Sequence, residues 1–397
     1  MNAFLNLLER VLIGIFALAF GALAIYGVNR YQQGVAEDSD PWRRAKKENS
    51  IEGYLAFLRE CQGCRREKDA EKILDELQRE RGLIARLDNA HLPERAGITL
   101  PAFSPDGRMV LATGGEGPDF WDTETGKRLS RGEKAFRNRG NRAVEWLAYS
   151  PDGHRVAAGT AAMEGGSLMA WDEATGTATG DRFVEDYDVK QVQFAPQPTT
   201  DGSLIGWMAQ GPVGIWEPAS GKFLRNTHEG ASALAFLRAD NGRLYMLTAA
   251  DKDIWAWDPA TMEIARQVRL NTDRPLLGLS QDGRTAVYSD GRVLELWDTR
   301  RGQQLAVLRD LSGDIVSFCR EPVHRWLAVG TKTGLLYLWD PAGSALPMAH
   351  VAAHEGPVES LACSSQGRLA STGWDSAKVW NIERVVRTEK LKEKEKP

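Results

Sequence analysis

Cysteine and histidine are the residue types in this chain that most readily bind metals or exchange electrons. Cys61 and Cys64 form one Cys-x-x-Cys pair, which can supply half of a zinc site or act as a redox couple. No second pair exists, only His91 follows nearby, and the flanking pattern is helical on both sides. We therefore interpret the pair as loop cysteines or a local disulfide in an oxidising compartment. Zinc shared between two chains is the alternative.

The histidines do not assemble into a catalytic or metal-binding pattern along the sequence. There are six, and they are dispersed over positions 91, 154, 228, 324, 350 and 354. His350 and His354 are four residues apart, but they precede a predicted strand and do not lie on a metalloprotease helix. Neither a glycine-rich phosphate loop nor a Gly-x-Ser-x-Gly elbow is present. We expect a protein that is not an enzyme, without catalytic residues, bound metal or cofactor.

A tryptophan followed by an acidic or amide residue recurs seven times, at intervals of 40 to 50 residues. Self-similarity at about 40–45 residues with a Trp-Asp ending is typical of a β-propeller built from four-stranded blades. The fold class that we predict is therefore an all-β seven-bladed β-propeller. The repeat tryptophans are Trp121, Trp171, Trp216, Trp257, Trp297, Trp339 and Trp380.

Turn residues recur in step with the tryptophans. Ser-Pro-Asp-Gly stands at 104–107 and again at 150–153, between two runs of strand character. Proline fixes φ at the first central position, aspartate bonds to nearby backbone, and glycine takes the left-handed conformation. A third strand then ends at each tryptophan, and glycine often follows five residues later. Agreement between turn chemistry and strand pattern supports the propeller prediction.

These residues resemble the WD-repeat family over about Leu83 to Val385. Repeats of that family often carry a structural hydrogen-bond network made by a histidine, a serine or threonine, an aspartate and the tryptophan. His354, Ser371, Asp375 and Trp380 match it in repeat seven. His228, Thr248, Asp251 and Trp257 approximate it in repeat four. The resemblance implies a structural role for His354 and His228.

The two ends of the repeat region are expected to share one blade. After Trp380 the chain lacks the glycine turn that precedes a fourth strand. Leu83 to Leu87 is a strand-like run without a tryptophan of its own, and it could supply the missing outer strand. Such closure would remove open sheet edges.

The N-terminal part contains a candidate membrane anchor. Residues 11–28 carry no charge and would rise about 27 Å as a helix, close to the thickness of a hydrocarbon core. A cleaved signal peptide is the alternative, because Ala22-Leu23-Ala24 is an acceptable cleavage motif. Positive charges follow the span, which favours a cytoplasmic propeller over an extracytoplasmic one. They are Arg30, Arg43, Arg44, Lys46 and Lys47.

Helical periodicity follows the predicted span. One apolar stripe comprises Ile51, Tyr54, Leu55 and Leu58, and a second comprises Ala70, Ile73, Leu74 and Leu77. Two stripes separated by the Cys61–Cys64 segment predict a helical hairpin. The predicted organisation is an N-terminal tail (1–10), a transmembrane helix (11–28), a helical hairpin (42–81), the propeller (83–385) and a disordered charged tail (386–397).

Partner binding is the function that this organisation favours. The 397 residues carry a net charge of −4, so we expect no nucleic-acid partner. Cys319 and Cys363 lie in predicted strands and are expected to be small core residues. The first inter-repeat gap is the longest and is basic, so it is either a solvated, flexible insertion or a candidate surface for an acidic partner or lipid headgroups. Its candidate residues are Arg128, Arg131, Phe136, Arg137, Arg139 and Arg142.

The expected function is a membrane-anchored, non-catalytic scaffold that binds one or more protein partners, which the sequence does not identify. The alternative is an extracytoplasmic propeller enzyme or a cofactor- or ligand-binding sensor. Bound metal or a coloured cofactor in the purified protein would favour that alternative, because function belongs to sites and not to folds.

Overall fold

The computed structural model describes residues 40–87, 101–114, 117–129, 143–161, 165–185, 187–196, 204–228, 230–309 and 311–395. The chain forms two compact units, residues 1–77 and residues 78–397. The predicted span at 11–28 lies outside the described residues. Within the described ranges, no helix has both the length and the apolar character needed to cross a bilayer.

The described part of the first unit is helical. It contains α2 (Pro41–Glu48), α3 (Ile51–Glu60) and most of α4 (Glu67–Glu80). Asp40 caps α2 by accepting a hydrogen bond from the Trp42 amide, and Pro41 occupies the first turn, where a missing amide costs nothing. Ser50 caps α3 by accepting from the Gly53 amide at 2.9 Å. Trp42 packs on Phe57, with ring centroids 5.1 Å apart.

The prediction of a two-helix hairpin at 42–81 was incomplete, because this part of the chain has three helices. Both predicted stripes are in helices, and Ile51, Leu55 and Leu74 are buried. The missed helix, α2, is dominated by Arg, Lys and Glu. Only Ala45 is buried on it, so it shows no apolar stripe from which it could have been predicted.

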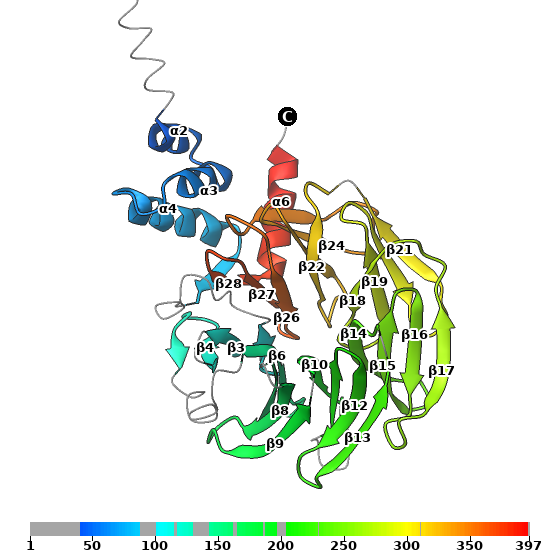
Figure 1. Ribbon diagram of the computed structural model, residues 1–397. Helices are drawn as coiled ribbons and strands as arrows, with labels where there is room; N and C mark the ends of the chain where they lie inside the picture. The colour runs from blue at the N-terminus through cyan, green and yellow to red at the C-terminus, as the bar shows by residue number, and fades with distance from the viewer. Residues whose placement is uncertain are drawn as a thin grey trace, which may run out of the picture. The chain divides into compact units, whose positions relative to one another are not determined.

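The second unit is a seven-bladed β-propeller, which confirms the predicted fold class for this part of the chain. Seven four-stranded sheets lie around a ring, and each sheet is antiparallel (Figure 1). Six blades take their strands in chain order, and the seventh combines strands from both ends of the propeller. We number the blades 1 to 7 along the chain.

The strand bounds of the first four blades are as follows. Blade 1 contains β2 (Ala102–Phe103), β3 (Met109–Gly114), β4 (Gly117–Asp122) and β5 (Arg128–Leu129). Blade 2 contains β6 (Ala143–Tyr149), β7 (Arg155–Ala161), β8 (Gly165–Asp172) and β9 (Ala178–Glu185). Blade 3 contains β10 (Val189–Phe194), β11 (Ile205–Ala209), β12 (Pro212–Glu217) and β13 (Lys222–Thr227). Blade 4 contains β14 (Ala233–Arg238), β15 (Leu244–Ala250), β16 (Asp253–Trp257) and β17 (Ile264–Arg269).

The remaining blades complete the ring. Blade 5 contains β18 (Leu276–Leu279), β19 (Thr285–Ser289), β20 (Leu294–Asp298) and β21 (Gln304–Leu308). Blade 6 contains β22 (Ile315–Arg320), β23 (Leu327–Thr331), β24 (Leu335–Trp339) and β25 (Ala349–Ala352). Blade 7 contains β26 (Ser360–Cys363), β27 (Arg368–Thr372), β28 (Ala377–Asn381) and β1 (Leu83–Arg86).

Blade 7 closes the ring as the sequence predicted. Strand β1 pairs antiparallel with β28, and Leu83 lies opposite Trp380. Backbone hydrogen bonds extend the pairing at both ends, from Leu87 N to Ala377 O and from Asn381 N to Gly82 O, each at 2.8 Å. The fourth strand of the last blade therefore comes from the segment that precedes the first blade.

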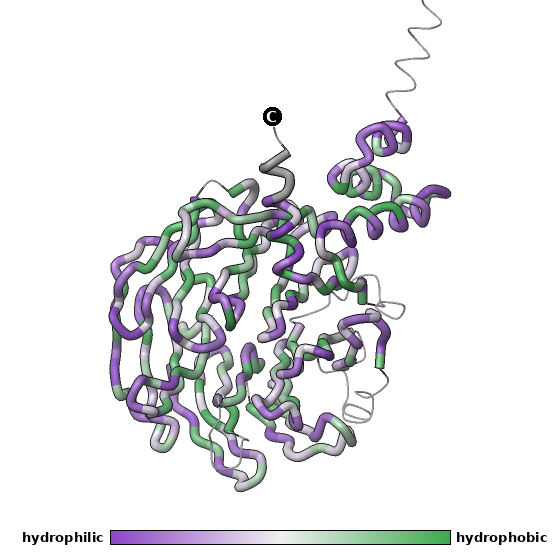
Figure 2. The backbone as a smooth tube through the Cα atoms, turned by 180° about the vertical axis from the view of Figure 1, so that it is seen from behind, coloured by the Kyte–Doolittle hydropathy of each residue, from purple (hydrophilic) through white to green (hydrophobic). Residues whose placement is uncertain are grey.

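The hydrophobic cores of the propeller lie between neighbouring blades. One cluster joins Met208 and Ile215 of blade 3 to Phe236 and Trp257 of blade 4. Another joins blade 7 to blade 1 through Leu87 and Trp121, among others. Figure 2 shows hydrophobic stretches running through the middle of the blades and hydrophilic ones along the outer rim. Because each core is shared by two blades, opening the ring would leave the core between the separated blades without one of its sides.

The Trp-Asp pattern has a simple structural basis. The tryptophan ends the third strand and is buried, as at Trp121 and Trp339. The acidic residue that follows begins the next turn. Asp122 Oδ1 accepts from the amide and the hydroxyl of Thr125, both at 2.7 Å, and Asp172 and Thr175 repeat this turn at 2.8 Å.

The predicted disordered tail at 386–397 was wrong for most of its length, because helix α6 (Ile382–Glu395) occupies it. Ile382, Val385 and Val386 are buried, so the helix is held by a short apolar stripe at its start. Arg81 also pairs with Glu389 at 2.8 Å. The lysine- and glutamate-rich sequence forms helix once such a stripe is anchored, since both residues have good helix propensity.

The cysteines are paired. The structure joins Cys61 to Cys64 in a disulfide, which is one of the interpretations given above. It also joins Cys319 of β22 to Cys363 of β26, with a Cα–Cα distance of 5.7 Å. The prediction that Cys319 and Cys363 are simple core residues was therefore wrong. The partners are 44 residues apart, and only their matching places in consecutive blades bring them together.

Candidate functional site

A hydrogen-bond network in blade 7 joins the four residues that matched the family pattern. Trp380 Nε1 donates to Ser371 Oγ at 2.8 Å. Ser371 Oγ and His354 Nε2 are 2.8 Å apart, and His354 Nδ1 lies 2.8 Å from Asp375 Oδ1. His354 and Ser371 are fully buried. The network ties the link before β26 to the turn between β27 and β28.

A neutral imidazole satisfies every member of this chain of hydrogen bonds. Trp380 donates to Ser371, the Ser371 hydroxyl donates to His354 Nε2, and His354 Nδ1–H donates to Asp375. Burial lowers the pKa of His354, although Asp375 opposes this effect. His354 is therefore neutral at neutral pH, as the hydrogen bonds require.

Asp375 is ionised and is balanced by a buried lysine. Burial opposes its ionisation, but the charge of Lys378 and hydrogen bonds from His354 and Ser376 lower the pKa of Asp375 well below its usual range. Lys378 Nζ lies 3.4 Å from Asp375 Oδ2 and donates to Ala353 O at 2.6 Å. The Lys378 side chain is fully buried. A buried charge is tolerated only with such partners.

We predict that the stability of the propeller falls as the pH is lowered from about 7.5 to 5.5. The pKa of His354 is lower in the folded state than its usual 6.5, so below that value the unfolded chain binds a proton that the folded one excludes. The loss approaches about 1.4 kcal/mol per pH unit below 6.5. Burial also lowers the pKa of His228, which adds in the same direction.

Melting temperatures measured across this range test the prediction. His354→Gln should make the pH dependence shallower, whereas His154→Gln, at an exposed turn position, should leave it as in the wild type. Equal slopes for wild type and His354→Gln would contradict a neutral, buried His354.

In blade 4 only half of the expected network forms. Trp257 Nε1 donates to Thr248 Oγ1 at 2.8 Å. His228 instead packs edge-on against Trp255, with ring centroids 4.2 Å apart, and its Nε2 has no hydrogen-bond partner among the described residues. Asp251 is exposed in a left-handed turn with φ of 49°. The structure therefore does not join His228 to Asp251, and the role there is ring packing.

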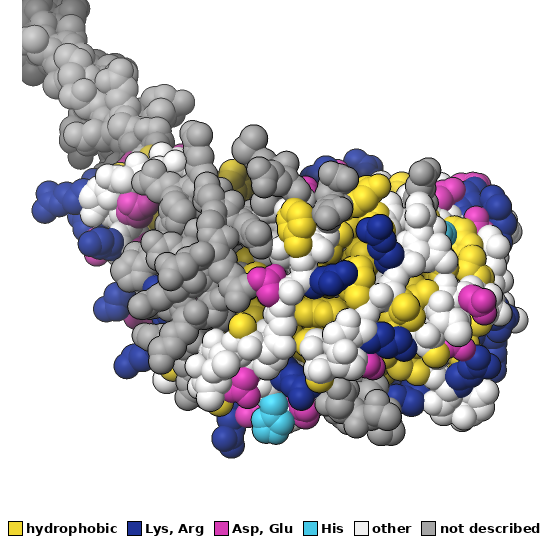
Figure 3. Space-filling model, turned by 60° about the horizontal axis from the view of Figure 1, so that its bottom comes forward, with side chains coloured by type: hydrophobic (Ala, Val, Ile, Leu, Met, Phe, Trp, Pro, Cys, Tyr) yellow, Lys and Arg dark blue, Asp and Glu magenta, His cyan; other side chains and the backbone are white. Residues whose placement is uncertain are grey.

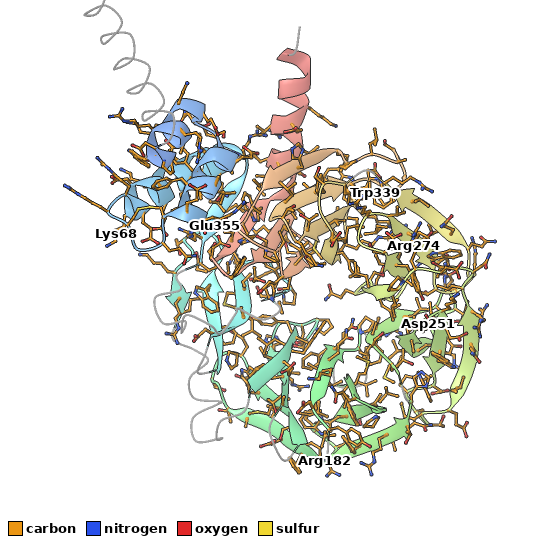
Figure 4. The ribbon with its side chains drawn as sticks, turned by 45° about the horizontal axis from the view of Figure 1, so that its top comes forward. Lys68, Arg182, Asp251, Arg274, Trp339 and Glu355 are labelled. Carbon is orange, nitrogen blue, oxygen red and sulfur yellow. A yellow bond between two sulfur atoms is a disulfide. The ribbon has the colours of Figure 1, made fainter. Side chains whose placement is uncertain are left out.

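Blade 5 has an ionic version of the blade 7 network, which the sequence analysis missed. Trp297 Nε1 donates to Glu295 Oε2 at 3.1 Å. Glu295 also accepts from Arg274 Nε at 3.1 Å, and Arg274 reaches Asp290. Arg274 precedes the first strand, as His354 does in blade 7, and Asp290 lies in the turn where blade 7 has Asp375. Figure 4 shows Arg274 and Asp251 on the neighbouring blades 5 and 4.

The other repeat tryptophans are also buried, but their polar contacts differ. Trp121, Trp171 and Trp216 are at most 4% exposed, and Trp339 Nε1 donates to Ser344 O at 2.5 Å.

The sequence did not predict that Lys378 is buried, because a lysine in a strand usually points to solvent. Its position two residues before Trp380 places both side chains on the same side of the strand, and this signal could have revealed it.

The basic candidate surface is described only at its first residue. Arg128 pairs with Asp119 at 2.8 Å, so its charge is balanced within blade 1. The other five candidates lie outside the described residues: Arg131, Phe136, Arg137, Arg139 and Arg142.

The propeller has two faces, which differ in the connections that they carry. We define the linker face as the face that carries two kinds of connection. One is the turn between the second and third strands of each blade, such as residues 373–376 in blade 7. The other is the link from one blade to the next, such as residues 353–359 between blades 6 and 7. Trp374 lies on this face and is 72% exposed, more than any other large hydrophobic residue described. Its ring lies directly over Gly356, where a larger residue would collide with it.

Trp374 is exposed but held in place by its surroundings. Its neighbour Asp375 belongs to the buried network, and Gly373 N donates to Ser376 O at 3.0 Å across the turn. Tryptophan is enriched among the residues that dominate binding energy in protein interfaces. A rigid, exposed tryptophan loses little entropy on binding, so this arrangement suits an anchor for a partner.

The exposed aliphatic residues are less suited to this role. Val323 and Leu346 lie on the opposite face, and Ile264 and Leu305 lie singly on the outer strands of blades 4 and 5. Leucine and valine are under-represented at binding hot spots.

On the side shown in Figure 3, Lys and Arg side chains are interspersed among the hydrophobic ones. Arg182, on the outer rim of blade 2, covers the Phe223 ring at 4.6 Å (Figure 4).

No known family model matches this chain, and no curated protein matches it. The structure thus defines a seven-bladed β-propeller, and the resemblance to WD repeats rests on the residues described above.

Proposed function

We propose that this protein is a WD-repeat propeller that binds a protein partner through the linker face of blade 7 and has no catalytic role. The exposed Trp374 carries this proposal, because it is a large apolar side chain presented to solvent on a rigid turn. The buried groups of blade 7 hold this turn: His354, Asp375 and Lys378 are engaged with one another and with the backbone.

The proposal includes attachment to a membrane through residues 11–28. Eighteen residues without a charge match the length of a bilayer-spanning helix. The helical segment at 41–80 would then separate the anchor from the propeller along the chain. Attachment would confine the linker face to partners in or near the same membrane.

We predict that Trp374→Ala removes most partner binding without unfolding the propeller. Truncation of a hot-spot tryptophan costs about 2–4 kcal/mol of binding free energy, which is a 30-fold loss of affinity or more. Affinity capture of the full chain from its own membranes, with quantitative mass spectrometry, measures the loss. Because the side chain is mostly exposed, the melting temperature should change by no more than a degree or two.

The matched control is Val323→Ala, which removes an exposed hydrophobic side chain from the opposite face of the ring. It should leave the captured partner at the wild-type level. Equal recovery of the same partner by wild type and Trp374→Ala would show that the linker face of blade 7 is not the binding site.

A further inference from the structure

The Cys319–Cys363 disulfide links two neighbouring blades. Cys319 lies on β22, the first strand of blade 6, and Cys363 lies on β26, the first strand of blade 7. Their Cα atoms are 5.7 Å apart, within the range that a disulfide spans without backbone movement. Blade 7 is also the blade that β1 completes. The bond therefore stabilises the part of the ring on which closure depends.

Every cysteine of the chain forms a disulfide bond. The sequence contains four cysteines, and both pairs, Cys61–Cys64 and Cys319–Cys363, are disulfide-bonded. The two pairs lie in different compact units of the protein. Protein disulfides persist in oxidising compartments, whereas cytosolic thiols are kept reduced.

We propose that the propeller functions on the extracytoplasmic side of the membrane, where Cys319 and Cys363 form a structural disulfide. The two thiols lose two protons and two electrons as the S–S bond forms. A protein disulfide oxidant of that compartment accepts them and is itself reduced to a dithiol. This assignment rests on the proposed membrane attachment, but it is independent of the partner that the linker face binds.

The charges beside residues 11–28 favoured the opposite orientation. Arg43, Arg44, Lys46 and Lys47 follow the span, and positive charges are usually retained in the cytoplasm. That preference governs short loops, whereas long domains cross the membrane largely regardless of charge. More than 300 residues follow these charges, so the disulfides are the stronger indicator.

Thiol trapping of the full chain in its own cells tests the proposal. Acid quenching and alkylation block free thiols, and reduction followed by a maleimide-linked polyethylene glycol then counts the cysteines that were oxidised. We expect four labels after reduction and none before it. The double variants Cys319→Ala/Cys363→Ala and Cys61→Ala/Cys64→Ala should each show two. If Cys319 and Cys363 carried no label after reduction, they would have been free thiols in the cell, and the proposal would be overturned.

Two further measurements test the cellular compartment of the propeller and the structural role of the Cys319–Cys363 disulfide separately. A C-terminal reporter that is active only outside the cytoplasm should be active, and an inactive reporter would overturn the assignment. Reduction should lower the melting temperature of the purified wild type by roughly 10 °C, because the bond closes a long loop. The same shift is expected for Cys61→Ala/Cys64→Ala. An unchanged melting temperature in the wild type would show that Cys319–Cys363 is not structural.

Discussion

Deletion of residues 83–87 should unfold the entire propeller at temperatures where the wild type is stable. The deletion removes β1 and exposes the edge of β28, and it removes the buried side chains Leu83 and Leu87. Each buried leucine contributes about 1.5–3 kcal/mol and each backbone hydrogen bond about 1 kcal/mol. The expected loss exceeds about 5 kcal/mol, and the melting temperature should fall by more than about 10 °C.

A pair of leucine substitutions distinguishes the loss of ring closure from the general effect of placing a charge on an outer strand. Leu83→Asp places a charge at a position that is 3% exposed on the outer strand of blade 7. Leu305→Asp makes the same change at a position that is 52% exposed on the outer strand of blade 5. Thermal melts followed by circular dichroism should show a large loss for Leu83→Asp and a small one for Leu305→Asp. If both melted like the wild type, β1 would not hold the ring closed.

Asp375→Asn should destabilise the propeller by about 3–5 kcal/mol. The substitution removes the negative charge 3.4 Å from Lys378 Nζ, so this fully buried side chain loses its ion pair with Asp375. It also leaves His354 Nδ1–H facing an amide in place of a carboxylate. Denaturant unfolding of the full chain gives the change in the free energy of unfolding.

Asp251→Asn is the matched control, because Asp251 occupies a turn in blade 4 but is exposed. Asparagine tolerates the left-handed conformation found there, so the change should stay within about 0.5 kcal/mol. The double variant Asp375→Asn/Lys378→Met should recover part of the lost stability, since it also removes the buried charge that Asp375 balances. A loss at Asp375 no larger than at Asp251 would contradict the ionic network.

Much of the propeller was predictable because its signals are local and repeated. Trp121 and Trp171 each end a strand and Asp122 and Asp172 each begin a turn, so one pattern marks both the core and the turn. Closure by Leu83–Leu87 was predictable from a different local signal: a strand-like run without a tryptophan beside a last repeat that lacks its fourth strand.

The elements that were missed depend on tertiary contacts that no local pattern carries. Cys319 meets Cys363 only because consecutive blades stack in register. Helix α6 forms because Ile382, Val385 and Val386 are buried, and these three residues are too few to stand out in a charged tail. The buried Lys378 contradicts the general preference of lysine for the surface, and its tertiary contacts with Asp375 and Ala353 O help to explain it.

Photo-cross-linking from the linker face tests the proposed function most directly. A photoreactive amino acid at position 359, an exposed site in the link before β26, should give a discrete cross-linked protein in native membranes. The same probe at position 305, on the outer rim of blade 5, should give none. Cross-links from 305 but not from 359 would contradict binding through the linker face.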